Sequence, residues 1–437
     1  MLPLLALLPL AQIFDAPALR GAHVTAYVIA AQSGQVLYAR DPDDAMMPAS
    51  TFKLLVGSAA LDDLGTTFAF TTTLATDGST LYVRGDGDPL LKSDDFNNAA
   101  SALAAAKATQ FDGLVADLSA VPVPYPDGWA IDDLPYDYAA APSALSIDGN
   151  TIAIKVVPGA VGAPPALSGS GQQDTASIVN EATTGPAHSK DTLTLSLAFD
   201  SPDTLILTGS VPVDETDAEV DAAVLDPARA ALASLSTALF AGNISIANAA
   251  PRYATTPANA RVLWTHRSEA LPQLLRDMWV PSDNLIAESL LDAFAPTRDA
   301  AIARERRWLQ SIGVDPHTVT IADGSGLSAY DRISARDEVA ILAHDWHGPD
   351  GQTVIGALPI AGERGTLSDA FATPPLRDNV IAKTGTVNHT RTLAGYLMTP
   401  HGTLIFALMI NGWMDDGPNS DADLRAFQTT FLEPFFR

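Results

Sequence analysis

Ser50 and Lys53 have the residue types and the spacing of a nucleophile and its base. They stand three positions apart, and the apolar residues from Phe52 to Leu61, followed by Gly65, predict a helix. Residues i and i+3 of a helix share a face, so the Lys53 ammonium can lie beside the Ser50 hydroxyl. A serine hydroxyl needs such a partner, and the free N–H groups of a first helical turn favour a developing oxyanion. A lone pair of this kind is nevertheless more often a capped helix with a surface lysine.

Two further motifs change that balance. Ser282-Asp283-Asn284 opens a second predicted helix, and Lys383-Thr384-Gly385-Thr386 follows the strand-like residues 380–382. S-x-x-K, S-D-N and K-T-G in this order are the signature of penicillin-recognising serine enzymes. The chain has only six lysines, and two of them fall in these motifs. Taken alone, the second motif would be a helix cap and the third a turn.

The first and third motifs together could begin an acyl transfer. Ser50 would attack a carbonyl and Lys53 would take its proton, which requires a lysine pKa below the free value of about 10. Burial or a neighbouring cation lowers a lysine pKa, and Lys383 is our candidate cation. Thr384 and Thr386 point together from a strand, so they could grip a substrate carboxylate, to which Lys383 adds charge.

The remaining residues of the motifs suit the later steps. Gly385 would let the substrate backbone approach the strand closely. We expect the backbone N–H groups of Ser50 and Thr386 to stabilise the oxyanion. Ser282 could relay a proton to the leaving amine, and Asn284 could hold a substrate amide.

Composition excludes several classes of protein. The 437 residues are 47% hydrophobic and 17% charged, which is globular and enough for two or three domains. Cysteine is absent, which excludes disulfides and thiol catalysis. A formal net charge of −26 argues against nucleic acid as a partner and against docking on anionic lipid. No apolar run reaches the ~20 residues of a membrane-spanning helix.

Other polar clusters give weaker signals, and we predict neither a cofactor nor a metal ion. Asp86 and Asp88 lie in a glycine-rich loop that is better explained as an Asx turn than as a cation site. The eight histidines show no zinc-binding H-E-x-x-H spacing. Gly324-Ser325-Gly326 lacks the spacing of a nucleophile elbow.

The predicted elements divide the chain into two outer parts and a middle part. A hairpin from His23 to Ala39 leads into the Ser50 helix. From about Val262 the pattern favours helices, and strands from Val380 and a helix from Ala422 follow. The first hairpin and helix therefore belong with the C-terminal sheet, and roughly 200 residues are inserted between them.

These residues resemble the class C low-molecular-mass penicillin-binding proteins, the D-alanyl-D-alanine carboxypeptidase/endopeptidase family called peptidase S13. Beyond the three motifs, similar segments run through most of the chain, at residues 85–89, 128–133, 143–146, 282–288, 323–328, 358–362 and 382–386. Together they are highly specific, although none would suffice alone.

The resemblance implies an α+β fold of mixed α/β layers. A penicillin-binding, serine β-lactamase-like transpeptidase domain, an antiparallel sheet flanked by helices, would be interrupted by a large inserted domain carrying a nested small β-rich domain. We place the transpeptidase domain in residues 17–62 and 262–437, the inserted domain in 63–150 and 207–261, and the nested domain in 151–206. Residues 1–16 are a candidate leader segment, although they lack a basic region.

The resemblance also implies an activity and its residues. It implies cleavage of the D-Ala-D-Ala bond of peptidoglycan stem peptides and cross-links in the periplasm, through an acyl-enzyme that β-lactams would also form. By motif match the catalytic set is Ser50, Lys53, Ser282, Asn284 and Lys383, and the substrate-binding set is Thr384, Gly385, Thr386 and Asp133.

One position departs from the family pattern. The family commonly has an arginine after Asp-Gly-Ser-Gly-Leu-Ser that helps recognise the third residue of the stem peptide, and here Ala329 stands in its place. Asp133 matches the other side of that pocket, and Arg332 is a candidate substitute for the arginine. The preferred stem peptide and the balance of carboxypeptidase and endopeptidase activity stay open.

Two other functions remain as alternatives. A serine β-lactamase or esterase could share the fold, although such enzymes usually lack so long an insertion and a β-lactamase must deacylate quickly. A non-catalytic cell-wall binding protein is the second alternative, and the intact set of motif residues speaks against it. Peripheral association with the membrane or the cell wall and the oligomeric state stay open.

Overall fold

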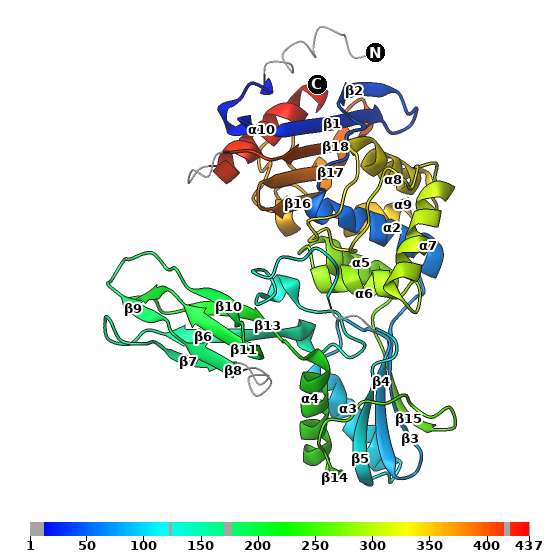
Figure 1. The fold of residues 1–437 in the computed structure, drawn as a ribbon. Helices are drawn as coiled ribbons and strands as arrows, with labels where there is room; N and C mark the ends of the chain where they lie inside the picture. The colour runs from blue at the N-terminus through cyan, green and yellow to red at the C-terminus, as the bar shows by residue number, and fades with distance from the viewer. Residues whose placement is uncertain (1–12, 122–124, 170–176, 415–419, 437) are drawn as a thin grey trace. The chain divides into compact units, whose positions relative to one another are not determined.

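The computed structural model describes residues 13–121, 125–169, 177–414 and 420–436 (Figure 1). The chain divides into two compact units. Unit 1 consists of residues 1–68 and 270–437, and unit 2 of residues 69–269. The three-part division that we predicted, with its boundaries, stays a prediction.

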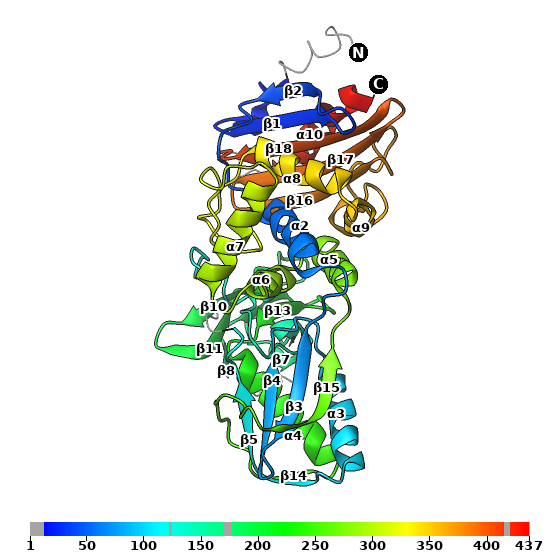
Figure 2. The ribbon, with the colours of Figure 1, turned by 90° about the vertical axis from the view of Figure 1, so that its right-hand side faces the viewer.

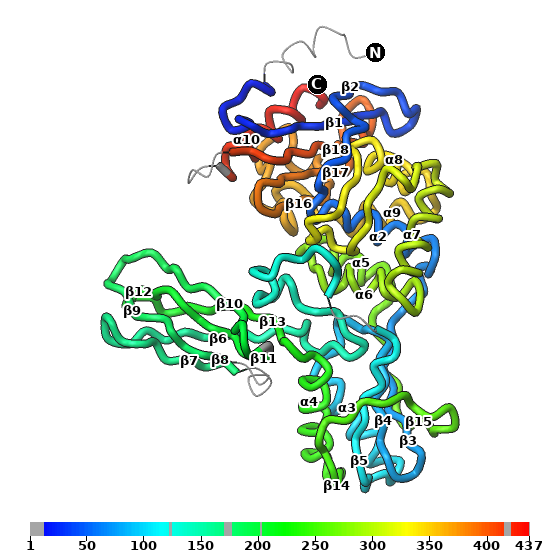
Figure 3. The backbone as a smooth tube through the Cα atoms, viewed as in Figure 1, coloured from blue at the N-terminus to red at the C-terminus, as the bar shows by residue number. Residues whose placement is uncertain are grey.

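Unit 1 is built on a five-stranded antiparallel sheet with the order β16-β17-β18-β1-β2. Its strands are β1 (His23–Ala30), β2 (Val36–Arg40), β16 (Val380–Val387), β17 (Thr390–Thr399) and β18 (Gly402–Asn411). β1 pairs with β18 along its whole length, from His23 opposite Asn411 to Ala30 opposite Leu404. The two outer parts of the sequence therefore form one sheet, which is visible as blue beside orange-red in Figure 3.

Helices cover both faces of this sheet (Figure 2). Val24, Ala26 and Val28 alternate along β1 and join one buried core with α10 (Ser420–Phe436). Tyr27 points to the other face, where its hydroxyl accepts a hydrogen bond from Arg336 of α8 at 2.9 Å. Because successive strand residues point to opposite faces, β1 separates the α10 layer from the α8 layer.

The remaining helices of unit 1 carry or support the predicted motifs. They are η2 (Pro17–Leu19), η3 (Ala49–Phe52), α2 (Lys53–Leu64), α5 (Leu271–Trp279), α6 (Asn284–Asp292), α7 (Arg298–Ser311), α8 (Ala335–His347), α9 (Gly351–Ala357) and η7 (Gly365–Leu367). Three of the α-helices begin at a side-chain cap, in which Asp283, Thr297 or Ser334 accepts a backbone N–H of the first turn.

Unit 2 contains a second five-stranded sheet with the order β14-β5-β4-β3-β15. Its strands are β3 (Thr71–Thr76), β4 (Thr80–Gly85), β5 (Gln110–Asp117), β14 (Ser245–Asn248) and β15 (Arg261–Arg267). The helices α3 (Ser93–Ala105) and α4 (Pro227–Ala241) pack against it. Our prediction that helices resume at about Val262 was wrong there, because residues 261–267 pair with β3 as an edge strand.

Three small sheets complete unit 2, with the orders β13-β6-β7, β10-β11-β8 and β12-β9. Their strands are β6 (Thr151–Val157), β7 (Ala166–Gly169), β8 (Ser177–Asn180), β9 (Thr183–Gly185), β10 (Thr194–Ala198), β11 (Ser201–Thr208), β12 (Ser210–Pro212) and β13 (Glu219–Ala223). The short helices η4 (Asp137–Ala139) and η5 (Asp148–Asn150) precede them. Within the described residues, no helix is both long and apolar enough to cross a membrane.

Candidate active site

Ser50 lies in a tight turn at the start of its helix. The turn η3 runs directly into α2, and the Ser50 side chain is half-buried while its neighbours are buried. Ala49 has a φ of +49°, in the left-handed region that non-glycine residues rarely adopt. A Cβ on Gly326 would lie 1.9 Å from the Ala49 carbonyl oxygen, so the loop can pack against this turn only as glycine.

Two threonines and a buried acid fix the turn from the other side. The Thr51 hydroxyl donates to the Pro48 carbonyl at 2.8 Å and lies 2.6 Å from Glu338 Oε1. Thr392 of β17 donates to the same carbonyl at 2.6 Å. Burial raises the pKa of Glu338 to about 8, so this carboxyl group is mostly protonated at neutral pH. The Ser50 turn is thus tied to both β17 and α8.

Lys53 meets three oxygens from three parts of unit 1. Its Nζ donates to Ser50 Oγ at 2.9 Å, to the Ser325 carbonyl at 2.8 Å and to Asn284 Oδ1. The side chain is fully buried. Burial lowers the pKa of Lys53 to about 8, against the opposing charges of nearby carboxylates, of which Asp323 is the strongest. The neutral amine is therefore accessible near neutral pH.

Buried acids hold the loop that supplies the Ser325 carbonyl. Glu288 of α6 accepts the backbone N–H groups of Gly324 and Ser325 at 3.0 and 2.9 Å. Asp323 accepts those of Gly326 and Ser328 at 2.6 and 2.7 Å. Carboxylates that accept several backbone donors fix a loop without leaving buried polar groups unpaired.

Lys383 and Ser282 form the second lysine–serine contact. The Lys383 Nζ donates to Ser282 Oγ at 2.9 Å and to the Thr384 carbonyl at 2.8 Å. Burial, and then the charge of Lys53, hold the pKa of Lys383 well below its ordinary value. We expected Lys383 to be the cation that lowers the Lys53 pKa. Burial is the largest cause of the lowered Lys53 pKa, and the contribution that we expected from Lys383 stays a prediction, because each of two neighbouring cations disfavours the charged form of the other.

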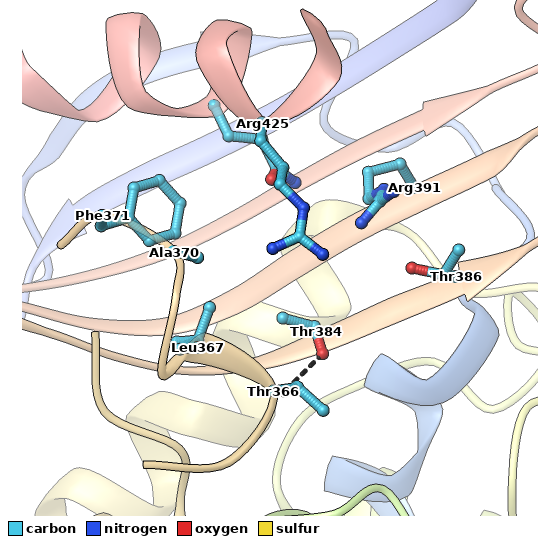
Figure 4. Close-up of a pocket in the computed structure, with 9 residues that line it drawn as sticks. Thr366, Leu367, Ala370, Phe371, Thr384, Thr386, Arg391 and Arg425 are labelled. Atoms are coloured by element: carbon cyan, nitrogen blue, oxygen red, sulfur yellow. Dashed lines mark hydrogen bonds between the residues drawn. The ribbon is translucent and has the colours of Figure 1, made fainter. Parts of the chain in front are cut away.

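Thr384 and Thr386 point together from β16 into a cavity of about 160 Å³ (Figure 4). The Thr384 hydroxyl donates to Thr366 Oγ1 at 2.7 Å. A Cβ on Gly385 would lie 2.1 Å from Thr392 Oγ1 and 3.0 Å from the Ser50 backbone nitrogen. Gly385 therefore packs against the Ser50 turn, and its expected role in admitting the substrate backbone stays a prediction.

Comparisons with known proteins agree with this geometry. The model of the D-Ala-D-Ala carboxypeptidase 3 (S13) family matches residues 8–430. A D-alanyl-D-alanine carboxypeptidase of Actinomadura sp. (strain R39) is 31% identical over 93% of this chain and 81% of the relative. The chain belongs to the S13 family. The family and the carboxypeptidase class that the motifs predicted are thereby confirmed.

Solved structures of S13-like proteins confirm the predicted mixed fold. Penicillin binding protein 4 from Haemophilus influenzae superposes with a TM-score of 0.88 at 24% identity, over 98% of this chain and 99% of that one. A structure of the same protein complexed with a β-lactam superposes with a TM-score of 0.81 at 23% identity, over 98% of this chain and 99% of that one. At these identities the likeness shows the fold alone.

The structure also describes the positions at which the S13 pattern predicts recognition of the third stem-peptide residue. Asp133 belongs to unit 2, where its Oδ1 accepts a hydrogen bond from the Tyr138 hydroxyl at 2.9 Å. Ala329 is exposed in unit 1. The Arg332 guanidinium donates to the carbonyl oxygens of Ala329 and Asp331 at 2.8 and 2.6 Å, so it is bound to its own loop.

The residues that position the S13 motifs were not predicted from the sequence. Thr51 and Glu338 fix the Ser50 turn, and Glu288 and Asp323 fix the loop behind Lys53. The Asp323 segment was noticed as part of the resemblance, but no role followed from it. Buried acids that are far apart in sequence give no spacing signal, and only their packing identifies them.

Proposed function

We propose that this S13 chain is a periplasmic serine DD-carboxypeptidase and endopeptidase. It would cleave the D-Ala-D-Ala bond of peptidoglycan stem peptides, and cross-links, through an acyl-enzyme at Ser50. The observation that carries the proposal is the 2.9 Å hydrogen bond between Lys53 Nζ and Ser50 Oγ, made by a buried lysine whose pKa is lowered to about 8. A base with a pKa near the working pH is suited to take a proton from a hydroxyl.

The proposed acylation uses the groups around Ser50. Its Oγ attacks the carbonyl carbon of the penultimate D-Ala, and its proton passes to the neutral Lys53 amine. The backbone N–H groups of Ser50 and Thr386 stabilise the oxyanion, and the Gly385 contact that keeps β16 against the Ser50 turn supports this role. The C–N bond then breaks and leaves an ester on Ser50.

The second lysine–serine pair serves the leaving group. Ser282 relays a proton to the departing amine, and its contact with Lys383 supports a proton path on that side of the site. Asn284 holds the Lys53 amine through Oδ1, a role that adds to the expected grip on a substrate amide. Water then hydrolyses the ester and restores Ser50.

The substrate and the location follow from the family. The Actinomadura relative is named for D-alanyl-D-alanine cleavage, and the Haemophilus neighbour was solved with a β-lactam. We therefore propose peptidoglycan stem peptides as substrates, β-lactams as covalent inhibitors and the periplasm as the location. Fractionation of the producing cells tests the last point, and recovery of the protein with cytoplasmic markers would contradict it.

Intact-mass spectrometry after incubation with benzylpenicillin tests the acyl-enzyme. We expect one persistent penicilloyl adduct on the wild-type protein and none on the Ser50→Ala variant. The same samples are given a peptide that ends in D-Ala-D-Ala, and release of D-Ala is measured. The variant removes one oxygen from a half-buried side chain, so circular dichroism should show an unchanged fold.

The two alternative functions predict different outcomes. Rapid drug hydrolysis without an adduct would replace the peptidase proposal with a β-lactamase. If the wild-type protein forms no adduct, does not hydrolyse the drug and releases no D-Ala, the non-catalytic binding protein is left as the explanation. An adduct that persists in the Ser50→Ala variant would place the nucleophile elsewhere.

A further inference from the structure

The cavity beside Thr384 and Thr386 is small and has one apolar and one cationic side. Leu367 and Phe371 contribute apolar surface, and Arg391 and Arg425 contribute the charge (Figure 4). Its volume of about 160 Å³ is below the ~300–1,000 Å³ of pockets that hold drug-sized ligands. It therefore suits the end of a peptide rather than a whole one.

Arg391 stands directly beside the proposed carboxylate site. It is the cross-strand partner of Thr386 in the pairing of β16 with β17. Residues in such a pair share a face, with Cβ atoms only ~5 Å apart. The Arg391 side chain is 9% exposed, and among the described residues its Nε has no hydrogen-bond partner. A guanidinium held at this register lies where it can meet a carboxylate that Thr386 binds.

Arg425 brings a second guanidinium to the same cavity from α10. Asp421, in the first turn of that helix, pairs with Arg425 at 2.9 Å and also with Arg391. Two cations thus share one carboxylate, and of the described residues that line the cavity none is acidic. Burial, and then the charge of Arg425, lower the pKa of Arg391 to about 10.

A purely structural role explains only part of this arrangement. The Asp421 bridge would tie α10 to β17 whatever the cavity holds. It does not account for a second arginine at the same carboxylate, with both arginines lining the cavity. The chain has only 25 lysines and arginines against 51 acids, so two arginines at one small cavity are unusual for its surface.

We propose that Arg391 and Arg425 recognise the free α-carboxylate of the residue that leaves, and so determine specificity for it. The inference rests on the proposed acyl transfer at Ser50. The Thr386 hydroxyl, and the Thr384 hydroxyl once it exchanges its bond to Thr366, bind the carboxylate from β16. The guanidinium groups bind it from β17 and α10. Planar guanidinium donors suit a carboxylate, and such charge-assisted hydrogen bonds are the strong ones.

The test compares two peptides that differ only at the C-terminus. One ends in D-Ala-D-Ala with a free carboxylate and the other in the carboxamide. Arg391→Gln should lower kcat/KM about tenfold to a hundredfold for the acid, mainly through KM, and leave the amide within about twofold. Arg391→Lys keeps the charge without the planar fork, and should recover part of the loss.

A matched control and a second variant protect the test from misfolding. Arg425→Gln changes a side chain that is 43% exposed, so it should fold and lower the acid-to-amide ratio by a smaller factor. Arg336→Gln removes the same charge from a side chain that is 44% exposed on another part of unit 1, and should not change the ratio. An unchanged ratio in folded Arg391→Gln and Arg425→Gln would overturn the inference.

Benzylpenicillin and its methyl ester separate this inference from the proposed function. The drug carboxylate stands in for that of the leaving residue, so the arginine variants should slow acylation by the acid and not by the ester. If the wild-type protein is acylated but the variants keep the same acid-to-ester ratio, only the arginine inference fails. If the wild-type protein neither forms an adduct nor cleaves peptide, the proposed function fails and the inference with it.

Discussion

The two ends of the site in unit 1 are built from opposite charges. Around Lys53 the neighbouring buried groups are acids, with Asp323 and Glu288 behind the amine. Around Thr386 the charged neighbours are the cations Arg391, which is buried, and Arg425, which is 43% exposed. Burial lowers the pKa of Lys53, and the acids oppose that shift, so the value settles at about 8.

The difference shows what each end is suited to do. A buried amine with acids nearby can change its protonation state near neutral pH, which a general base requires. Arginine stays protonated, so the other end keeps a fixed positive charge that can attract an anion. We therefore propose that one end moves a proton and that the other binds a carboxylate.

The largest effect should come from Lys53→Arg. The guanidinium keeps the positive charge beside the acids but cannot give it up, so it cannot accept the Ser50 proton. We expect acylation by benzylpenicillin to slow by about 10²–10⁴-fold, measured by time-resolved intact mass. Lys190→Arg, at an exposed position of unit 2, serves as the control. A rate within tenfold of wild type would show that Lys53 acts through its charge alone.

Gly385→Ala should have the next largest effect, because this residue keeps the two ends together. The new Cβ would lie 2.7 Å from the Pro48 carbonyl and 3.0 Å from the Ser50 nitrogen, so β16 and the Ser50 turn must separate. A displacement of about 1 Å can cost on the order of a hundredfold in rate. The rate of acylation by benzylpenicillin should therefore fall about a hundredfold.

Gly356→Ala is the matched control for that substitution. Gly356 lies in α9 with no heavy atom within 4 Å of a new Cβ. Its acylation rate should stay within about twofold of wild type, and its melting temperature should hold or rise slightly. Equal rates for the two alanine variants would show that the close contact at Gly385 does not position Ser50.

The sequence predicted the local parts of this arrangement well. The i, i+3 spacing placed Lys53 beside Ser50, and period-2 alternation placed Thr384 and Thr386 on one face. Both follow from the geometry of a single helix or strand. The pairing of the first hairpin with the last strands was also predicted, because the three motifs had to meet.

The parts that failed depend on residues far apart in the chain. β15 was missed because it is an edge strand with most of its side chains exposed, so it lacks a clear alternating pattern. The contact of Gly385 with the Ser50 turn joins residues more than 330 positions apart, so no local pattern indicates it. Arg391 has no motif of its own, and only its register with Thr386 reveals it.

The pH dependence of acylation tests the proton-transferring end. Lys53 must be neutral to accept a proton, and the neutral fraction rises with pH until the pKa of about 8 is passed. The rate constant for acylation should therefore rise about tenfold per unit from pH 6 towards pH 8, and level off above it. Stopped-flow or quenched-flow measurements with benzylpenicillin give the profile. A flat profile across this range would remove Lys53 as the titrating base.

Asp421→Asn should give the smallest effect and tests the anion-binding end in the opposite direction. The substitution removes the carboxylate that Arg391 and Arg425 share, so the cavity gains positive charge. Because Asp421 is 56% exposed, solvent screens it, and we expect KM for a peptide with a free carboxylate to fall only about twofold to fivefold. The gain should shrink as salt is added, and the carboxamide peptide should show none. A rise in KM would mean that Asp421 matters more for aiming the Arg391 guanidinium than for neutralising it, and that the cavity depends on geometry before charge.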